Sequence, residues 1–192
     1  MDGETSEAGG AGTSPVVLVE GESDAVLVRY VLASRGAVAD VLPMGGVTNL
    51  PRCLERHGGP SRRVLTLLDA DEQRVAVRAL RRFGRDAETA DELARHGVFV
   101  CERDLEDLLI RALGPDRVLD GLAAMGELGA FASFSRMPQW RRRHVVDRLH
   151  RFAGSGSGRK ARLAAALAPR LDPDDLPDPL DALVLAVLAA GP

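Results

Sequence analysis

Hydrophobic residues between residues 16 and 113 alternate between short continuous runs and longer stretches with helical spacing. The continuous aliphatic runs, typical of strands buried on both faces, cover residues 16–19, 38–42, 63–68 and 97–101. The stretches with helical spacing follow them at residues 23–35, 48–56, 71–83 and 104–113. Four strand–helix pairs with short links predict an α/β, Rossmann-like fold, a mostly parallel four-stranded sheet flanked by helices.

The chain beyond this pattern changes in character. Residues 116–192 show helical spacing and no strand pattern, which predicts an α-helical C-terminal extension after a domain at residues 15–115. Gly114 and Pro115 are expected to end the preceding helix, and Pro138 is expected to open a helix that runs to Phe152. The acidic, Gly- and Ser-rich residues 1–14 predict a disordered leader.

Composition fits a soluble globular protein, with 192 residues, 45% hydrophobic and 28% charged. The longest apolar run, residues 182–190, is far shorter than the ~20 residues of a membrane helix, and no signal peptide pattern precedes the first strand. Cys53 and Cys101 are isolated, without zinc-site spacing. We therefore expect a cytoplasmic protein without membrane contacts.

The basic residues are unevenly chosen. The chain has 25 lysines and arginines, and all but Lys160 are arginine. Arginine replaces lysine at most solvated positions but does not provide the same compact ammonium group. Lys160 is therefore a position to examine for a specific role.

Carboxylates follow the predicted strands at the edge where α/β sheets bind ligands. Glu20 ends the first strand and Asp24 lies four residues later, while Asp69 and Asp71 follow the third. The alternation of an extended chain predicts that Asp69 and Asp71 leave the strand on the same side. Such a cluster is typical of a site for a hard divalent cation such as Mg²⁺.

A third acidic group follows the fourth strand. It contains Glu102, Asp104 and Glu106. The alternative interpretation of several of these acids is a helix N-cap or a charge in the first helical turn. That alternative applies less well to Glu20 and Asp69, because both close strands predicted to be buried.

Four segments together resemble the TOPRIM domain of topoisomerases, primases and OLD-family nucleases, most closely its OLD branch. They are VVLVEGESD at residues 16–24, MGGVTNL at 44–50, LLDAD at 67–71 and DLED at 104–107. In that branch, a glutamate, an acid four residues on, an Asp-x-Asp pair and a later glutamate hold two metals. The residues at the matching positions are Glu20, Asp24, Asp69, Asp71 and either Glu106 or Glu102.

The resemblance implies an Mg²⁺- or Mn²⁺-dependent DNA endonuclease or nickase. Two ions would act together, one activating water and the other stabilising the leaving 3′-oxygen. The implied catalytic residues are Glu20, Asp69, Asp71 and Lys160. In OLD-type enzymes a basic residue before an Ala/Leu helix reaches the metal site, and Lys160 in GRKARLAAALA has that position. The alternative for Lys160 is a solvated side chain beside a flexible Gly/Ser loop.

Two further segments are candidates for contact with nucleic acid. Gly45, Gly46 and Thr48 precede a predicted helix, where backbone N–H groups bind phosphate; a plain left-handed turn explains the glycines equally well. In the helix predicted from Pro138, one face is a candidate track for a DNA backbone, the alternative being a solvated face near the acidic segment 169–179. The residues of that track are Trp140, Arg141, His144, Arg148 and Arg151.

OLD proteins ordinarily carry an ATPase domain ahead of the TOPRIM module, whereas only residues 1–14 precede it here. The resemblance therefore predicts a stand-alone TOPRIM protein, with any ATPase supplied by a separately encoded chain. Two other functions remain open at this point. One is a non-catalytic nucleic-acid-binding subunit of such an ATPase, and the other is nucleotidyl transfer, as in primases.

Overall fold

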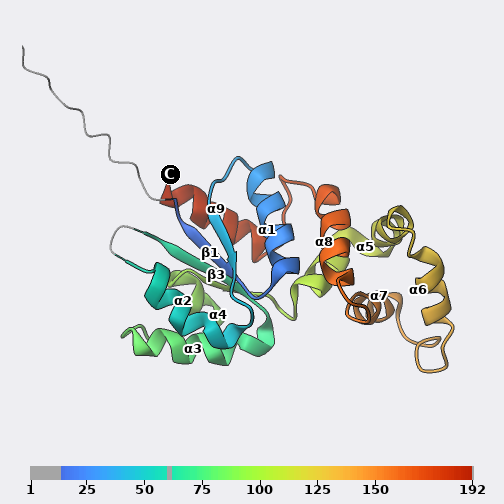
Figure 1. Ribbon diagram of the computed structural model, residues 1–192, viewed down its shortest axis with the longest axis horizontal. Helices are drawn as coiled ribbons and strands as arrows, with labels where there is room; N and C mark the ends of the chain where they lie inside the picture. The colour runs from blue at the N-terminus through green and yellow to red at the C-terminus, as the bar shows by residue number, and fades with distance from the viewer. Residues whose placement is uncertain (1–13, 60–61, 192) are drawn as a thin grey trace, which may run out of the picture.

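The computed structural model describes residues 14–59 and 62–191, so the predicted leader lies outside the described residues except for Ser14. The predicted α/β fold class is confirmed. All strand pairs are parallel, in the order β2-β1-β3-β4 (Figure 1). The strands are β1 (Val16–Val19), β2 (Asp40–Pro43), β3 (Val64–Leu68) and β4 (Val98–Val100).

Helices follow each strand as predicted, with an additional helix, α4, that was not predicted before β4. Before β4 they are α1 (Glu22–Ser34), α2 (Leu50–His57), α3 (Gln73–Arg82) and α4 (Ala90–Arg95). After β4 they are α5 (Leu105–Ala124), α6 (Leu128–Ser135), α7 (Val145–Ala153), α8 (Arg159–Leu167) and α9 (Leu180–Ala190). Short 3₁₀ helices occur at η1 (Val47–Asn49), η2 (Ala70–Glu72) and η3 (Ala168–Arg170).

Helices cover both faces of the sheet, which explains why its strands are continuously apolar. Val17 and Val19 of β1 point into a core shared with α1, α5, α8 and α9. Val16 and Leu18 point the other way, into a second core with α2, α3 and α4. Figure 1 shows α1 and α9 on one side of the strands and α2, α3 and α4 on the other.

The strand order places a topological switch point between β1 and β3. From β1 the chain crosses through α1 to β2 on one side, and from β3 it crosses through α3 and α4 to β4 on the other. The two connections therefore diverge and leave a crevice beyond the carboxyl ends of β1 and β3. Ligands bind at this position in open α/β sheets.

The predicted helix end at Gly114 is a break inside a longer element. Gly114 has φ 75° and ψ 160°, which is not helical, and Pro115 directly after it starts a second helical segment that runs to Ala124. The predicted boundary at residue 115 thus falls within α5. The core on that face of the sheet takes residues from both sides of the boundary, including Leu109 and Leu167.

The helix predicted from Pro138 was placed too early. Residues 138–143 form turns, and α7 begins only at Val145, with the His144 side chain accepting a hydrogen bond from the Val146 N–H at 3.4 Å. Trp140 stacks on Phe134 with ring centroids 5.2 Å apart, which folds this segment back onto α6. A tertiary contact therefore overrides the local helical spacing.

Two smaller findings concern the cysteines and the membrane. Cys53 and Cys101 are both free thiols. Across residues 14–59 and 62–191, no helix combines the length and apolar character that crossing a membrane would require.

Candidate active site

The carboxyl ends of β1 and β3 bring together two carboxylates that are far apart in the sequence. Glu20 directly follows β1 and Asp69 directly follows β3, and the two strands are hydrogen-bonded neighbours. Both side chains are partly buried, and the charge of Glu20 contributes to a raised pKa at Asp69. The crevice at the switch point is therefore acidic.

Asp24 joins this site from the first turn of α1 and also has a local structural role. One carboxylate oxygen accepts a hydrogen bond from the Gly21 N–H at 2.9 Å, and the other lies 3.3 Å from the Ser23 hydroxyl. The N-cap is Gly21, so the alternative of a first-turn charge, and not that of an N-cap, describes Asp24 locally. Its charge also interacts with those of Glu20 and Glu106, so it belongs to the acidic site as well.

Glu72 occupies the place beside Glu20 and Asp69 that the sequence predicted for Asp71. The chain turns into the 3₁₀ helix η2 at Ala70, so the alternation of an extended strand ends at Asp69. Glu72 interacts with both Glu20 and Asp69, whereas Asp71 is exposed and lies at the rim, where it lines a shallow pocket with Asp69. Asp69 and Asp71 thus line one pocket, but Asp71 reaches it from a 3₁₀ helix and not, as predicted, from an extended strand.

Glu106, and not Glu102, faces the other carboxylates. Glu106 lies in the first turn of α5 with its side chain 10% exposed, and its charge acts on Asp24 and Asp69. Glu102 is exposed in the preceding loop, where it lines the same outer pocket as Asp71. The sequence left Glu106 and Glu102 as alternatives for one metal-binding position, and the geometry favours Glu106.

Lys160 reaches the site from α8. Its Nζ donates a hydrogen bond to Glu106 Oε2 at 2.9 Å. The helix is fixed at its start by Arg159, which contacts Glu127 and lies 4.0 Å over the ring of Phe152. Burial lowers the pKa of Lys160, but the hydrogen bond and charge of Glu106 outweigh it and the pKa is raised. Lys160 is therefore a protonated cation at the acidic site.

Asp104 and His150 form a pair that sequence patterns did not indicate. His150 Nε2 lies 2.6 Å from one Asp104 oxygen, and the other oxygen caps α5 by accepting from the Asp107 N–H at 2.8 Å. Burial raises the pKa of Asp104, but these hydrogen bonds hold it below its usual range. His150 lies on α7, forty-six residues away, and nothing local in the sequence marks it.

The acidic cluster is defined here as six side chains: Glu20, Asp24, Asp69, Glu72, Asp104 and Glu106. Burial is the largest cause that raises the pKa of three of them, to about 6 for Asp24, about 7 for Asp69 and about 8 for Glu72. Repulsion from neighbouring carboxylates adds to burial at each one. The cluster therefore gathers six carboxyl groups beside the cation of Lys160, which contacts only Glu106 among them.

The side chains of the acidic cluster have the chemistry of ligands for a hard divalent cation, but they are not arranged around a single point. Their donor atoms are carboxylate oxygens, and Glu72 Oε2 is buried with no hydrogen-bond partner in the described chain. However, within residues 14–59 and 62–191, no three His, Cys, Asp or Glu side chains converge closely enough to hold a metal. The side chains would have to turn toward a shared ion.

The loop predicted to bind phosphate, at Gly45 and Gly46, makes hydrogen bonds to the segment after β1. The N–H groups of Gly45 and Gly46 both donate to the Glu20 carbonyl, at 3.0 and 3.2 Å. These donors are therefore not free for a phosphate, and Thr48 is exposed with no side-chain hydrogen bond in the described chain. The glycines have φ 70° and 112°, so the plain turn is the correct interpretation.

The predicted nucleic-acid track is not one helix face. Arg141 lies in the turns before α7 and His144 caps that helix, so only Arg148 and Arg151 share it. Trp140 is stacked on Phe134. The five residues are thus divided between a turn, a cap and a helix, and Trp140 has a packing role.

Comparison with known proteins gives matches only at the level of structure. No family model matches the sequence, and no curated protein does either. The C-terminal region of the Burkholderia pseudomallei OLD protein superposes with a TM-score of 0.65 at 19% identity, covering 93% of this chain and 98% of that one. A structure of the C-terminal region of the Xanthomonas campestris pv. campestris OLD protein gives 0.62 at 24% identity, covering 93% and 95%. The chain therefore has the fold of OLD C-terminal regions along nearly its whole length, which confirms the fold that the sequence resemblance implied.

Proposed function

We propose that this protein is a divalent-metal-dependent nuclease that cleaves phosphodiester bonds in DNA. The observation that carries the proposal is the convergence of the acidic cluster with Lys160 at the switch point of an OLD-type fold. The carboxylates directly follow β1 and β3 or lie in η2, in α1 and at the start of α5, and the cation comes from α8. Burial, together with repulsion between the carboxylates, raises the pKa values of Asp24 and Asp69, and such perturbed groups are frequent at functional sites.

Glu20, Asp24, Asp69 and Glu106 are the residues that would hold Mg²⁺ or Mn²⁺, with Glu72 as an additional donor. When bound, such ions neutralise the carboxylates, generate a nucleophile from water at neutral pH and stabilise the leaving oxygen. Asp71 and Glu102, at the rim, are better placed for outer contacts.

Lys160 has a separate task in this proposal. Its ammonium lies on Glu106, at the edge of the cluster, and its raised pKa keeps it protonated. A phosphate that enters the cluster brings further negative charge, which a fixed cation stabilises more strongly as the charge grows in the transition state. The Asp104–His150 pair borders the same outer pocket as Asp69.

The test is nicking of supercoiled plasmid with Mg²⁺ or Mn²⁺. We expect the wild-type protein to nick, and Asp69→Asn to lower the rate by about 10²-fold or more, because one ligand oxygen pair loses its charge. Asp120→Asn, an exposed carboxylate on α5, is the matched control and should leave the rate unchanged. Absence of wild-type nicking with either metal, or equal rates for the two variants, would contradict the proposal.

The same assay separates Asp71 from Glu72. The family pattern assigns the metal-binding role to Asp71, whereas the geometry favours Glu72. We expect Glu72→Gln to reduce nicking more than Asp71→Asn. The reverse order would mean that η2 rearranges when metal binds.

A non-catalytic nucleic-acid-binding subunit is the second candidate, and one observation favours it. No three donors are gathered at metal-binding distance within the described ranges. If DNA binding is measurable while nicking is absent with both metals, this second function is preferred.

A further inference from the structure

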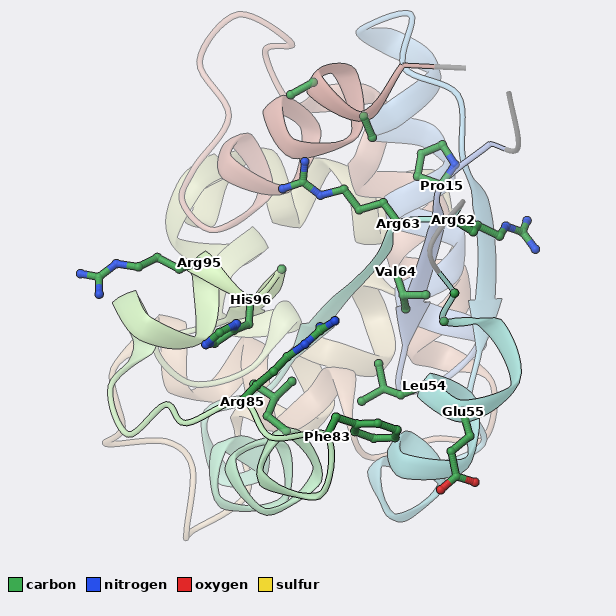
Figure 2. A pocket seen from close by; sticks show the side chains of 16 residues that line it. Pro15, Leu54, Glu55, Arg62, Arg63, Val64, Phe83, Arg85, Arg95 and His96 are labelled. Carbon is green, nitrogen blue, oxygen red and sulfur yellow. The ribbon is translucent and has the colours of Figure 1, made fainter. Parts of the chain in front are cut away.

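A large cavity lies at the opposite edge of the sheet, where the strands begin (Figure 2). Its volume is about 1050 Å³. Its lining comes from the segment before β3, the end of α2, the α3–α4 connection and the end of α4. The acidic cluster lies at the carboxyl ends of the same strands, so the two sites are separate.

The cavity is lined by cations from three segments. Arg62 and Arg63 precede β3, Arg85 follows α3, and Arg95 and His96 end α4. In Figure 2 the Arg85 side chain extends into the opening and Arg63 crosses its upper side, whereas Arg62 and Arg95 point away from it. One carboxylate, that of Glu55, also belongs to the lining.

Most of this charge is not neutralised by the protein itself. Arg62 pairs with Asp40, and His96 Nε2 lies 3.2 Å from the Asp86 carbonyl. In contrast, Arg63, Arg85 and Arg95 make no ion pair with any described residue. In a protein with a net charge of −3, three arginines of the cavity lining thus have no ion-pair partner among residues 14–59 and 62–191.

Helix ends account for only part of this arrangement. A cation at the end of a helix interacts favourably with the free carbonyl groups there, and Arg95 has that position in α4. Arg85 lies just after the end of α3, and its backbone N–H donates to the Leu80 carbonyl at 3.1 Å, so the same interaction applies to it. Arg63 precedes a strand and lies at no described helix end, and an anionic ligand would explain its presence at the cavity.

The cavity also has apolar surface and a cationic connection toward the candidate active site. Leu54 and Phe83 line it beside the arginines, and Phe83 is 40% exposed. On α3, Arg74 and Arg78 line a second hollow that begins at Asp71, on the rim of the acidic site. Helix α3 therefore links the two edges of the sheet with exposed arginines.

We propose that this cavity binds the phosphate groups of a nucleic-acid strand that runs along α3 from the active site. Guanidinium groups bind phosphate through paired hydrogen bonds, and apolar surface such as Phe83 suits a sugar or base. The choice of nucleic acid over a free nucleotide rests on the proposed function and on the arginines of α3. Phosphate recognition itself rests on the cavity alone.

The experiment measures binding of a fluorescent single-stranded oligonucleotide of about 20 nucleotides, and of the matching duplex, by anisotropy in EDTA. Cleavage is not needed, so binding and the nuclease proposal fail separately. We expect the triple variant Arg63→Gln/Arg85→Gln/Arg95→Gln to bind at least about tenfold more weakly, with a salt-dependence slope smaller by about 2 to 3. The control is Arg142→Gln/Arg143→Gln, two exposed arginines before α7, which should bind like the wild type.

Each alternative outcome has a defined meaning. Equal oligonucleotide affinity and salt slope for the triple variant and the wild type would overturn the proposal. A loss only in the Arg142/Arg143 control variant would move the nucleic-acid surface to the segment before α7 and also overturn it. In a competition arm, ATP that displaces the oligonucleotide only at millimolar concentration supports a nucleic-acid site; micromolar displacement by ATP would assign the cavity to a free nucleotide instead.

Discussion

The two edges of the central sheet carry opposite charge under very different conditions. At the carboxyl edge, carboxylates are packed together and partly buried, and their pKa values rise. At the amino edge, Arg63, Arg85 and Arg95 are exposed around an open cavity. Like charges repel at both edges, but water screens the arginines far better than the carboxylates.

Because of this difference, the two edges should affect the free energy of folding to different extents. Gathering buried carboxylates costs free energy unless a cation arrives, so the acidic cluster stays destabilising until it binds a ligand. Exposed arginines cost little in the free protein. Substitutions at the carboxyl edge should therefore change both stability and activity, and those at the amino edge should change only binding.

The strongest way to break the acidic edge is to remove its lysine. Lys160→Met leaves Glu106 buried without its partner and removes the fixed cation, so we expect plasmid nicking to fall by about 10²- to 10³-fold. Initial rates at saturating Mg²⁺ measure the effect. Arg162→Met, on the same helix and paired with Glu127, is the control. A Lys160→Met rate within about twofold of the wild-type rate would remove Lys160 from the mechanism.

The second prediction concerns how the stability of the protein depends on pH, which tests the electrostatic repulsion at the carboxyl edge. Asp24, Asp69 and Glu72 have raised pKa values in the folded protein, so between about pH 4 and pH 8 the folded state binds more protons than the unfolded state. Without metal, the free energy of unfolding should therefore fall as pH rises from 5 to 8.5. After allowance for solvent screening we expect a loss on the order of 1–2 kcal/mol, measured by urea unfolding at each pH.

Asp69→Asn provides the control for that measurement. It removes one of the repelling charges, so the metal-free variant should be more stable than the wild type at pH 8.5 and nearly equal to it at pH 5. Added Mg²⁺ should stabilise the wild type more than the variant. A wild-type stability that rises between pH 5 and 8.5 would contradict the electrostatic account of the cluster.

The smallest effect is expected at the amino edge. The triple variant Arg63→Gln/Arg85→Gln/Arg95→Gln removes exposed side chains that make no ion pair with any described residue, so its free energy of unfolding should stay within about 1 kcal/mol of the wild-type value. Thermal and urea unfolding at pH 7.5 measure it. A larger loss would show that these arginines stabilise the helix ends and would weaken the contrast between the two edges.

The sequence predicted those parts of the fold that local pattern determines. All four aliphatic runs became strands of one parallel sheet, because continuous burial on both faces leaves a clear signal. Glu20 and Asp69 were found at the carboxyl edge because they follow such strands directly. The role of Lys160 as a partner of the acidic site followed from composition together with the family resemblance.

Features that depend on the tertiary structure could not be predicted in this way. Glu72 lies beside Glu20 and Asp69 because the chain turns at Ala70, which the Asp-x-Asp spacing does not reveal. His150 meets Asp104 only because α7 packs on α5. The cations of the amino edge come from three segments without a shared motif, so only the folded chain shows them together.

The contact between Lys160 and Glu106 also has a consequence for how the chain folds during synthesis. The strands and the carboxylates are complete once residue 106 has been made, but the lysine belongs to a helix made more than fifty residues later. Until α8 and α9 have been synthesised, one face of the sheet lacks the helices that cover much of it, and the carboxylates lack their lysine partner. The carboxylates are therefore synthesised first and their lysine more than fifty residues later, so the acidic cluster gains this cation only after α8 has been made.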